Sequence, residues 1–518
     1  MKLYKYMALG AVIASASLGT SCVGDLDITP DDPNKQTSPE NKDQWIGYFG
    51  TLYGNLLYEG NLTPTGVDGG AGTFSRCHWN LQELTTDEVV LLNTWNDPGY
   101  ADIKFDTWTS NNVWSYMCMQ REATSARQCM EFVANIDAAS SLFSAEEIEQ
   151  MKAEAYVLHA LNYYYMIDLF GRGPWCAYGE KVGETPATYD RQQLFDATVA
   201  ELTAAIDGGH LLPAAQQVYG RVSREAARML LAKLYLNAEV YTGTPMYTEC
   251  AAQCKEILKT IPDLVPEYKY LFCGTNDKYV GNGEILWSIP SDPVTQQSYG
   301  GTTYLTAGAY FGSVEPEELQ RLGNPNSIWN GLKMKPELVE AFEPGDKRAL
   351  YYAGSFNLSV ADLNSTEADG DGYMCVKYVV TDEDDYYNTA NNSQSIVFPK
   401  TDFPLFRLAD LYLMLTECQL RGVADADPGY NYFNKVRARA GLAASTPNLD
   451  ALLHERLVEL YWEGHRRSDL VRFGKFTGNA YVWSWKGGVP GGTTIASNRN
   501  VFAVPYQYVS TVGQNPGY

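Results

Sequence analysis

The stretch ERLVELYWEGHRRSDLVRF, residues 455–473, combines an apolar helical pattern with a high density of charge. Its charged side chains recur every three or four positions and include Glu455, Glu459, Glu463, Arg466, Arg467 and Asp469. Residues at this spacing lie on one face of a helix, so we expect the acids and bases to pair along it. A catalytic carboxylate cluster is the alternative. We favour the structural role, because neighbouring arginines keep carboxylates ionised and paired.

Other segments also place apolar residues every three or four positions, which is typical of amphipathic helices. They cover residues 144–165, 190–206, 224–238, 247–261, 408–420, 430–440 and 449–464. The first opens with a capping box, in which Ser144 caps the first turn and Glu147 reaches back to it. Paired helices of this length resemble tetratricopeptide-like hairpins. The predicted fold class is therefore mainly α, with tetratricopeptide-like helix pairs that form a curved scaffold.

Between about residues 271 and 404 the composition shifts to Gly, Asn, Asp, Ser and Tyr, with few helical patterns. Residues 284–290, EILWSIP, are typical of a short strand. We expect an inserted loop-rich region with minor β-structure, and loops on a rigid scaffold often carry binding sites. The predicted organisation is a signal peptide at 1–21, a lipidated acidic tether at 22–40, a helical scaffold with N-terminal binding loops at 41–270, the loop-rich region at 271–404, and returning helices at 405–518.

The N-terminus is typical of a secretory signal. Lys2 and Lys5 precede the apolar run Met7–Leu18, which is too short to span a bilayer as a mature helix. Small residues then lead to Cys22, so we expect Cys22 to become the acylated N-terminus of a bacterial lipoprotein. The alternative is cleavage by an ordinary signal peptidase with Cys22 uninvolved, since Gly19 stands where lipoprotein signals usually have an aliphatic residue.

The composition restricts the class of ligand. The net charge of −23 argues against nucleic acid and anionic lipid headgroups as partners, whereas neutral glycans are compatible with it. The chain contains 37 Tyr and 11 Trp, a high aromatic content. Many of these rings must be core, but a surplus also suits sugar binding, because a flat ring offers an apolar face and a polar edge.

The cysteines and acidic loops predict no disulfide framework, metal site or cofactor. Nine cysteines follow Cys22, an odd number without tight spacing, so we expect small buried thiols. Cys250 and Cys254 could supply two metal ligands, but no neighbouring pair completes a site. The acidic segments 369–372 and 382–385 lack the spacing of a calcium-binding EF-hand, so we interpret them as solvated loops.

Several long motifs resemble the SusD/RagB family of outer-membrane glycan-binding lipoproteins. Residues 403–412, FPLFRLADLY, are similar to the family's "PLFRLAEAYL" helix entry, and residues 455–473 resemble its E-R-x-E-x-x-x-E-G-x-R-x-x-D-L-x-R signature. Further similar segments are 22–27, CVGDLD; 163–175, YYYMIDLFGRGPW; and 514–518, QNPGY. The resemblance covers essentially the whole chain. Residues 230–242, 299–305 and 485–497 bring it nearest to the starch-binding members.

This resemblance implies a function without catalysis. Members of the family are α-helical proteins that lid a TonB-dependent transporter and hold a shallow glycan site out to solvent. We therefore expect a surface-exposed protein, lipid-anchored in the cell outer membrane, that captures starch-like α-glucan (malto-oligosaccharides) and delivers it to a SusC-like TonB-dependent transporter. A SusD-like binder of a different glycan is the alternative.

The resemblance also nominates site residues. The starch-binding relatives place an arginine before an E-L-x-T-D-E motif, with two closely spaced tryptophans and an asparagine after it. In this chain Arg76 precedes residues 83–88, ELTTDE, and Trp95 and Asn96 follow. Arg76 and Asn96 are expected to bind sugar hydroxyls, and Trp95 to stack on a sugar ring. Since only one of the two tryptophans is present here, the stacking geometry and the glycan remain open.

Two further rings complete the predicted site. Tyr299, ahead of two glycines, matches a stacking tyrosine of the family, and Trp329 lies near the expected place of another ring. For each aromatic residue the alternative is ordinary core packing, and Arg76 could instead be a surface ion-pair partner. The candidate glycan-binding residues are therefore Arg76, Trp95, Asn96, Tyr299 and Trp329.

Two other classes of protein were weighed against glycan binding. A glycoside hydrolase needs two carboxylates facing each other across a sugar. Asp87 and Glu88 are adjacent, and neighbours in an extended segment point to opposite faces. The chain also contains no G-x-S-x-G or H-E-x-x-H motif, so we predict no enzyme and no catalytic residue. The second class is a purely structural scaffold that binds protein and no sugar. In such a scaffold, unlike in a glycan-binding protein, Trp95, Tyr299 and Trp329 would not converge on one exposed face.

Overall fold

The computed structural model describes residues 39–59, 67, 69–92, 95, 97–179, 184–281, 283–310, 314–315, 317, 322, 328–352, 372–384 and 397–518. Contacts divide the chain into two units, one ending at Tyr48 and the other beginning at Phe49, within helix α2 (Lys42–Leu57). The predicted signal peptide, Cys22 and most of the tether lie outside the described residues. Everything below concerns the second unit.

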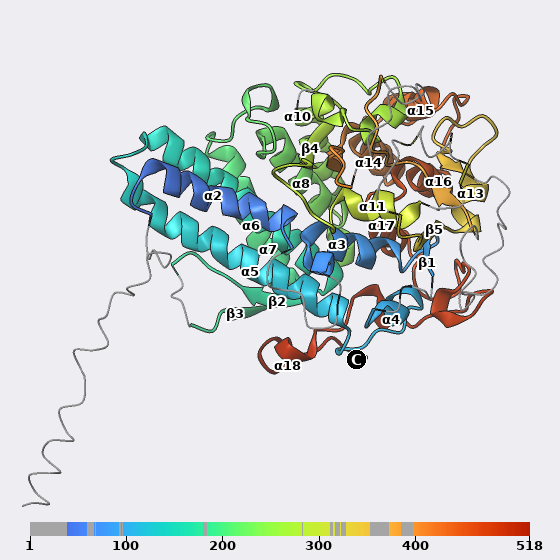
Figure 1. Ribbon diagram of the computed structural model, residues 1–518, viewed down its shortest axis with the longest axis horizontal. Coiled ribbons are helices and arrows are strands. Elements are labelled where there is room, and N and C mark those ends of the chain that lie inside the picture. Colours follow the sequence, from blue (N-terminus) through green and yellow to red (C-terminus); the bar gives the residue numbers. More distant parts are fainter. Residues whose placement is uncertain are drawn as a thin grey trace, which may run out of the picture. The chain divides into compact units, whose positions relative to one another are not determined.

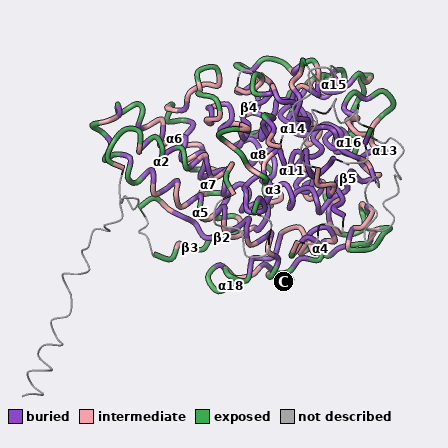
Figure 2. Tube along the Cα trace, viewed as in Figure 1, coloured by how far each residue is buried: buried purple, intermediate pink, exposed green. Residues whose placement is uncertain are grey.

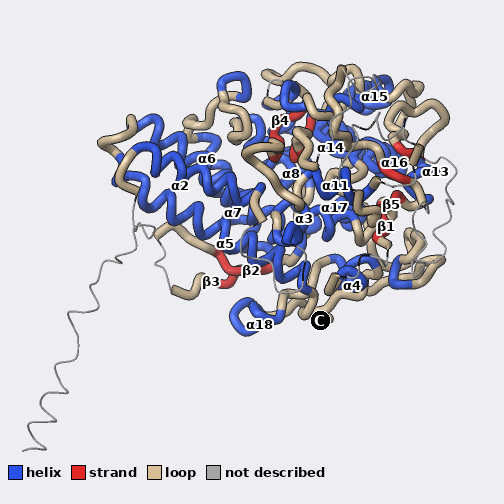
Figure 3. Tube along the Cα trace, viewed as in Figure 1, coloured by secondary structure: helices blue, strands red, loops and turns tan. Residues whose placement is uncertain are grey.

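Helices dominate this unit, as Figures 1 and 3 show. In the N-terminal half they are α3 (Phe74–Glu83), α4 (Tyr100–Lys104), α5 (Val113–Asn135), α6 (Ala145–Leu169), α7 (Arg191–Asp207), α8 (Arg224–Leu236), α9 (Ala238–Thr242) and α10 (Tyr247–Ile257). Consecutive long helices pack on one another: α5 on α6, α6 on α7, and α8 on α10. The prediction of a mainly α fold built from helix pairs is confirmed.

Local capping determines where the longest helices begin. The Ser144 hydroxyl accepts a hydrogen bond from the Glu147 N–H at 3.2 Å, and the Glu147 carboxylate accepts one from the Ser144 N–H at 2.7 Å. The capping box predicted at the start of α6 is therefore confirmed. Asp190 and Gln193 form a second box at the start of α7. The predicted helix 224–238 divides into α8 and α9 at Asn237, whose conformation is not helical.

The C-terminal helices are α14 (Leu408–Leu420), α15 (Asn431–Arg439), α16 (Leu449–Leu460), α17 (Arg466–Arg472) and α18 (Tyr506–Val512). Helix α14 packs on α10, α15 and α16, so the returning helices join the N-terminal scaffold. Figure 2 shows buried residues concentrated where α8, α11 (Thr302–Ala309), α14 and α16 lie. Among the described helices, none combines the length and apolar composition needed to cross a membrane.

Within the described residues, the strands form four two-stranded antiparallel pairs. They are β1 (Val89–Leu91) with β5 (Leu332–Met334), β2 (Arg172–Trp175) with β3 (Ala187–Asp190), β4 (Ile285–Ile289) with β8 (Phe403–Arg407), and β6 (Tyr351–Tyr352) with β7 (Met374–Cys375). The strand predicted at 284–290 is β4, so that prediction is confirmed. The predicted boundary at residue 404 falls inside β8, and the domain boundaries stay a prediction.

The cysteines behave as the sequence predicts. All nine in the described chain are buried and free. Buried thiols without disulfides are therefore confirmed.

The signature helix differs from its prediction in one respect. Helix α16 ends at Leu460, Trp462 adopts a left-handed backbone conformation with φ of 63°, and α17 begins at Arg466. The prediction that the charges of 455–473 pair along one helix is therefore wrong, because this turn separates the glutamates from the arginines. Arg466 pairs instead with Asp87, at 2.7 Å.

The glutamates of the signature pair with bases from distant elements, whereas Asp469 pairs with Arg456 and Arg472 of the signature itself. Glu455 pairs with Arg348 and Arg437, Glu459 with Arg348, Arg407 and Arg439, and Glu463 with Lys377 and Arg407. Burial alone would raise the pKa of Glu459, but the nearby guanidinium groups outweigh it and lower the pKa to about 2. The structural interpretation of these acids as ionised and paired is confirmed for Glu459, and the catalytic alternative is not supported.

We predict that thermal stability peaks between about pH 4 and pH 5. The lowered pKa values, about 2 for Glu459 and Asp469, give stability that is lost as pH falls below about 4 toward 2. Burial raises the pKa of Asp402 to about 6 and that of Asp106 to about 7, so the folded state holds their protons more tightly than the unfolded chain. That contribution is lost as pH rises from about 4 through these values. Glu83, whose pKa burial raises to about 7, adds to this loss, and together they outweigh the opposing gain from His78 and His465, whose pKa values burial lowers to about 3 and about 4.

The measurement is the melting temperature from about pH 2 to about pH 8. Asp402→Asn should flatten the decline above about pH 5 and leave the acid limb unchanged. A melting temperature that rises steadily between about pH 4 and pH 7 would contradict the prediction.

Candidate functional site

Four aromatic rings lie in a continuous row, which we call the aromatic row: Trp95, Trp329, Tyr299 and Phe398. Ring centroids are 6.1 Å apart for Trp95 and Trp329, 6.1 Å for Trp329 and Tyr299, and 5.0 Å for Tyr299 and Phe398. Tyr299 is 44% exposed and the other three are partly exposed. The structure thus brings together the three rings that the sequence nominated, and it leaves them accessible to solvent.

Strand pairing explains why Trp95 and Trp329, which are 234 positions apart in the sequence, lie side by side. Trp95 follows β1 and Trp329 precedes β5, and these strands are antiparallel with Leu91 opposite Leu332. The segment leaving β1 and the segment entering β5 therefore lie at the same end of the pair, beside α11 in Figure 1. The Trp95 indole N–H donates to the Trp329 carbonyl at 3.2 Å, and the Trp329 N–H donates to the Ala307 carbonyl of α11 at 2.7 Å.

Two glycines allow the close approach. A Cβ atom at Gly331 would lie 2.2 Å from the Trp95 ring, so this ring rests directly on the glycine backbone. A Cβ atom at Gly300 would lie 2.0 Å from the Thr73 hydroxyl, so the chain after Tyr299 lies against the start of α3. The Tyr299 N–H also donates to the Glu59 carboxylate at 2.9 Å. Backbone contacts therefore position Tyr299 and leave its ring exposed.

We predict that Gly331→Ala weakens ligand binding at the aromatic row with little loss of overall folding. The added methyl group cannot fit under Trp95, so the ring must leave its place beside Trp329. Gly301→Ala is the matched control, because a Cβ atom there meets nothing within 4 Å. Binding by isothermal calorimetry and folding by circular dichroism distinguish the two variants. Equal affinities for both would contradict the prediction.

Arg76 lies one layer beneath the row. It is 2% exposed, its guanidinium group lies 4.3 Å from the centroid of the Tyr304 ring, and it donates to the Tyr100 hydroxyl at 3.0 Å. The Tyr304 ring in turn lies 5.9 Å from that of Trp95. The structure therefore places Arg76 behind Tyr304, where it supports Trp95 indirectly, and its expected contact with sugar hydroxyls stays a prediction. Asn96 lies outside the described residues.

Sequence reasoning missed three groups at the row. Phe398 extends it beyond Tyr299, but no motif or periodicity marks this ring. Asn330 sits between the row and Gly331 in a left-handed conformation, with φ of 51°, and its side-chain oxygen accepts from Lys333. Glu59 holds Tyr299, as described above. Asn330 and Glu59 are partly exposed and flank the rings, so they are candidates for binding hydroxyl groups.

The carboxylates weighed for hydrolysis are enclosed in the interior. Asp87 is fully buried, and both of its oxygens accept from Arg466, at 2.8 and 2.7 Å. Glu88 is also buried and accepts from the Trp462 N–H at 2.8 Å. Burial, followed by the charge of Glu83, raises the pKa of Glu88. Neither group faces solvent, so this pair is not placed to act on a polysaccharide.

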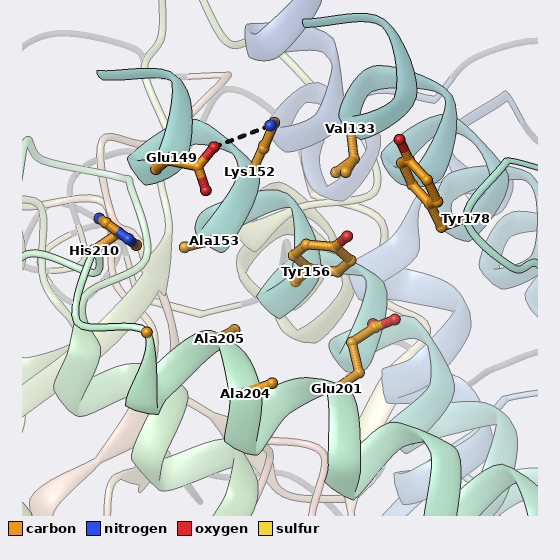
Figure 4. A pocket seen from close by; sticks show the side chains of 11 residues that line it. Val133, Glu149, Lys152, Ala153, Tyr156, Tyr178, Glu201, Ala204, Ala205 and His210 are labelled. Carbon is orange, nitrogen blue, oxygen red and sulfur yellow. Dashed lines mark hydrogen bonds and ion pairs between the residues drawn. The ribbon is translucent and has the colours of Figure 1, made fainter. Parts of the chain in front are cut away.

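A separate cavity of about 440 Å³ lies among α5, α6 and α7 (Figure 4). Tyr156, Glu149 and Lys152 project into it, and Lys152 pairs with Glu149 at 3.0 Å. None of the residues lining this cavity belongs to the aromatic row. The other charged groups of the lining, Glu201 and His210, pair with His159 and Glu146 outside it. Because the charged groups of the cavity already have partners, the aromatic row is the stronger candidate site.

Comparison with known proteins agrees with the fold. Residues 349–489 match the model of the SusD family, and residues 71–236 match a model described as starch-binding associating with outer membrane. The starch-binding protein SusD of Bacteroides thetaiotaomicron is 30% identical over 571 aligned positions, which cover 100% of this chain and 99% of SusD.

Solved structures show the same architecture. A laminarin-binding SusD-like protein has a TM-score of 0.68 at 20% identity, covering 93% of this chain and 100% of that one. Surface glycan-binding protein A from Bacteroides thetaiotaomicron, in complex with laminarihexaose, has a TM-score of 0.68 at 18% identity, covering 92% of this chain and 100% of that one. With full-length similarity to SusD and the match to the family model, this chain belongs to the SusD family.

Proposed function

We propose that this protein is a surface glycan-binding lipoprotein that captures starch-like α-glucan at the aromatic row and delivers it, uncut, to a SusC-like TonB-dependent transporter. The observation that carries the proposal is the row itself. Four adjoining, partly exposed rings are unusual on a protein surface, where contiguous apolar patches commonly mark a binding site. Sugar rings present apolar C–H faces that stack on such rings, while their hydroxyls need polar neighbours.

The tilt of the rings favours a curved glycan. Neighbouring planes in the row differ by 52°, 41° and 57°, so the four rings do not share one plane. An α-1,4-linked glucan coils and can present successive sugar faces to rings that are tilted relative to one another. A flat, extended chain would contact fewer of the four rings at once.

Membership of the family supports the rest of the proposal. The relative named above is a starch-binding protein, and one matching model is described as associating with the outer membrane. Acylation of Cys22 would provide the anchor, and two or more acyl chains hold a protein stably at a membrane. The enclosed positions of Asp87 and Glu88 support binding without hydrolysis.

The test is affinity electrophoresis of the purified protein through native gels that contain amylopectin, pullulan, laminarin, dextran, xylan or no glycan. We expect retardation by amylopectin and pullulan, and its loss in Trp95→Ala and Tyr299→Ala. Tyr506→Ala is the matched control, since Tyr506 is 70% exposed and lies outside the row. Retardation by laminarin instead would assign the row to a β-1,3-glucan, and unchanged mobility in every gel would refute glycan binding.

A further inference from the structure

Helices α3 and α5, which pack side by side, bring three potential metal ligands together in the interior (Figure 1). The imidazole Nε2 of His78 lies 3.0 Å from a carboxylate oxygen of Glu122, and the Cys118 thiol lies 3.5 Å from the same oxygen. The ligand atoms of all three residues lie within 4.8 Å of one another, and all three residues are buried. Neither the fold nor the proposed glycan site explains this cluster.

The orientation of His78 suits a metal ligand. Its Nδ1 lies 2.7 Å from the Phe74 carbonyl oxygen, which can only accept, so Nδ1 carries the proton. The lone pair of Nε2 therefore faces Glu122 and Cys118. Histidines that bind metals usually hold their ring in this way, with the second nitrogen donating to a carbonyl or carboxylate.

The spacing also suits a tetrahedral ion. Bond lengths of about 2.0–2.2 Å to nitrogen and oxygen and about 2.3 Å to sulfur place adjacent ligands roughly 3.3 to 3.6 Å apart around zinc. The separations from the Glu122 oxygen, 3.0 and 3.5 Å, are near these values, and the third pair, His78 Nε2 and Cys118 Sγ, lies within 4.8 Å and would close around the ion. The second carboxylate oxygen of Glu122 is buried and has no hydrogen-bond partner among the described residues, so the carboxylate can bind with both oxygens at one corner of the site.

We propose that His78 Nε2, Cys118 Sγ and both carboxylate oxygens of Glu122 form a structural site for a divalent transition-metal ion of the Zn²⁺ class. Nitrogen, thiolate and carboxylate ligands together favour Zn²⁺ over Mg²⁺ or Ca²⁺, which prefer oxygen ligands alone. The ion would tie α3 to α5. Since α3 carries Arg76, it would also hold the layer beneath the aromatic row.

The charge of a divalent ion would balance the charges of its ligands in this buried site. A metal-binding imidazole is neutral, whereas a ligating carboxylate and a ligating thiolate each carry one negative charge. Binding of M²⁺ replaces the protons of the carboxyl and the thiol and releases both to solvent, which leaves the site neutral. Because the ligands are enclosed, the ion enters while the chain folds.

The test begins with protein produced in medium supplemented with Zn²⁺ and purified without chelator. We expect elemental analysis to find one Zn²⁺ per chain in the wild type. Refolding with Co²⁺ alone should give a thiolate-to-cobalt charge-transfer band in the near ultraviolet. Cys118→Ser should abolish both signals. Cys129→Ser is the matched control, since Cys129 lies on α5 and is equally buried but is outside the cluster, and it should retain both.

The wild-type measurements test the proposal even if a variant fails to fold. Wild type refolded with excess Zn²⁺ should melt at a higher temperature than wild type refolded without metal, because a ligand that binds the folded state stabilises it, whereas Zn²⁺ should make no such difference to His78→Gln. A wild-type chain that retains no Zn²⁺ and shows no cobalt–thiolate band would overturn the proposal. So would a Cys118→Ser protein that folds and keeps the metal.

Discussion

Arg407→Met should lower the free energy of unfolding by about 3–5 kcal/mol, the largest effect on stability that we predict. All five N–H groups of the Arg407 guanidinium donate hydrogen bonds, to the carboxylates of Glu284, Glu459 and Glu463 and to the Glu459 carbonyl. Arg407 and these carboxylates are almost completely buried. Methionine fills similar space but removes the one base that contacts all three carboxylates, which leaves excess buried negative charge, and this is the costly way to break an ion-pair network.

Lys259→Met provides the contrast for this measurement. Lys259 pairs with Glu256 at 2.6 Å, but its side chain is 64% exposed. Exposed pairs contribute about 0–1 kcal/mol, so this variant should unfold almost as the wild type does. Urea unfolding of the wild type, Arg407→Met and Lys259→Met, monitored by circular dichroism, gives the comparison. If Arg407→Met costs no more than Lys259→Met, the buried network does not hold these elements together.

Trp329→Ala should lower the affinity for α-glucan by about 30-fold or more, the largest effect on binding that we predict. Trp329 is central in the aromatic row, since its ring contacts both Trp95 and Tyr299. Truncating a central aromatic anchor typically costs about 2 kcal/mol or more, and 2 kcal/mol corresponds to roughly 30-fold in affinity. Folding should be preserved, because the hydrogen bonds that hold this segment use the Trp329 backbone.

Isothermal titration with malto-oligosaccharides measures the effect. Phe398→Ala, at the end of the row, should cost less than Trp329→Ala, because its ring contacts one neighbour in the row, Tyr299. Tyr506→Ala should bind as the wild type does. An affinity of Trp329→Ala within twofold of the wild type would show that the ligand does not rest on this ring.

The candidate site was predictable in part. Trp95, Tyr299 and Trp329 were nominated by resemblance, and the structure brings them together. Phe398 was not, because a single ring in a loop has no local pattern, and its role depends on the position of Tyr299. Arg76 was expected among the sugar contacts, but tertiary packing buries it behind Tyr304. Sequence motifs preserve which residues recur and do not report the depth at which each one lies.

The charged signature at residues 455–473 was also predictable only in part. Its spacing predicted pairing within one helix, and the acids are indeed paired. The partners of its glutamates, however, include Arg348, Lys377, Arg407 and Arg439 from distant elements, and the turn at Trp462 redirects Arg466 to Asp87. A left-handed tryptophan is not recognisable from local propensity, so the break in the helix was not predictable.

By itself the sequence determined the helical scaffold, the capping box at Ser144, the strand at 285–289 and the free, buried cysteines. These features depend on periodicity and on residues within a few positions of one another. Only the tertiary structure decided the ion-pair partners, the depth of Arg76, the place of Phe398 and the meeting of His78 with Cys118 and Glu122. Each of these depends on segments far apart in the chain, whose separation is set by the packing of helices and strands and not by any local preference.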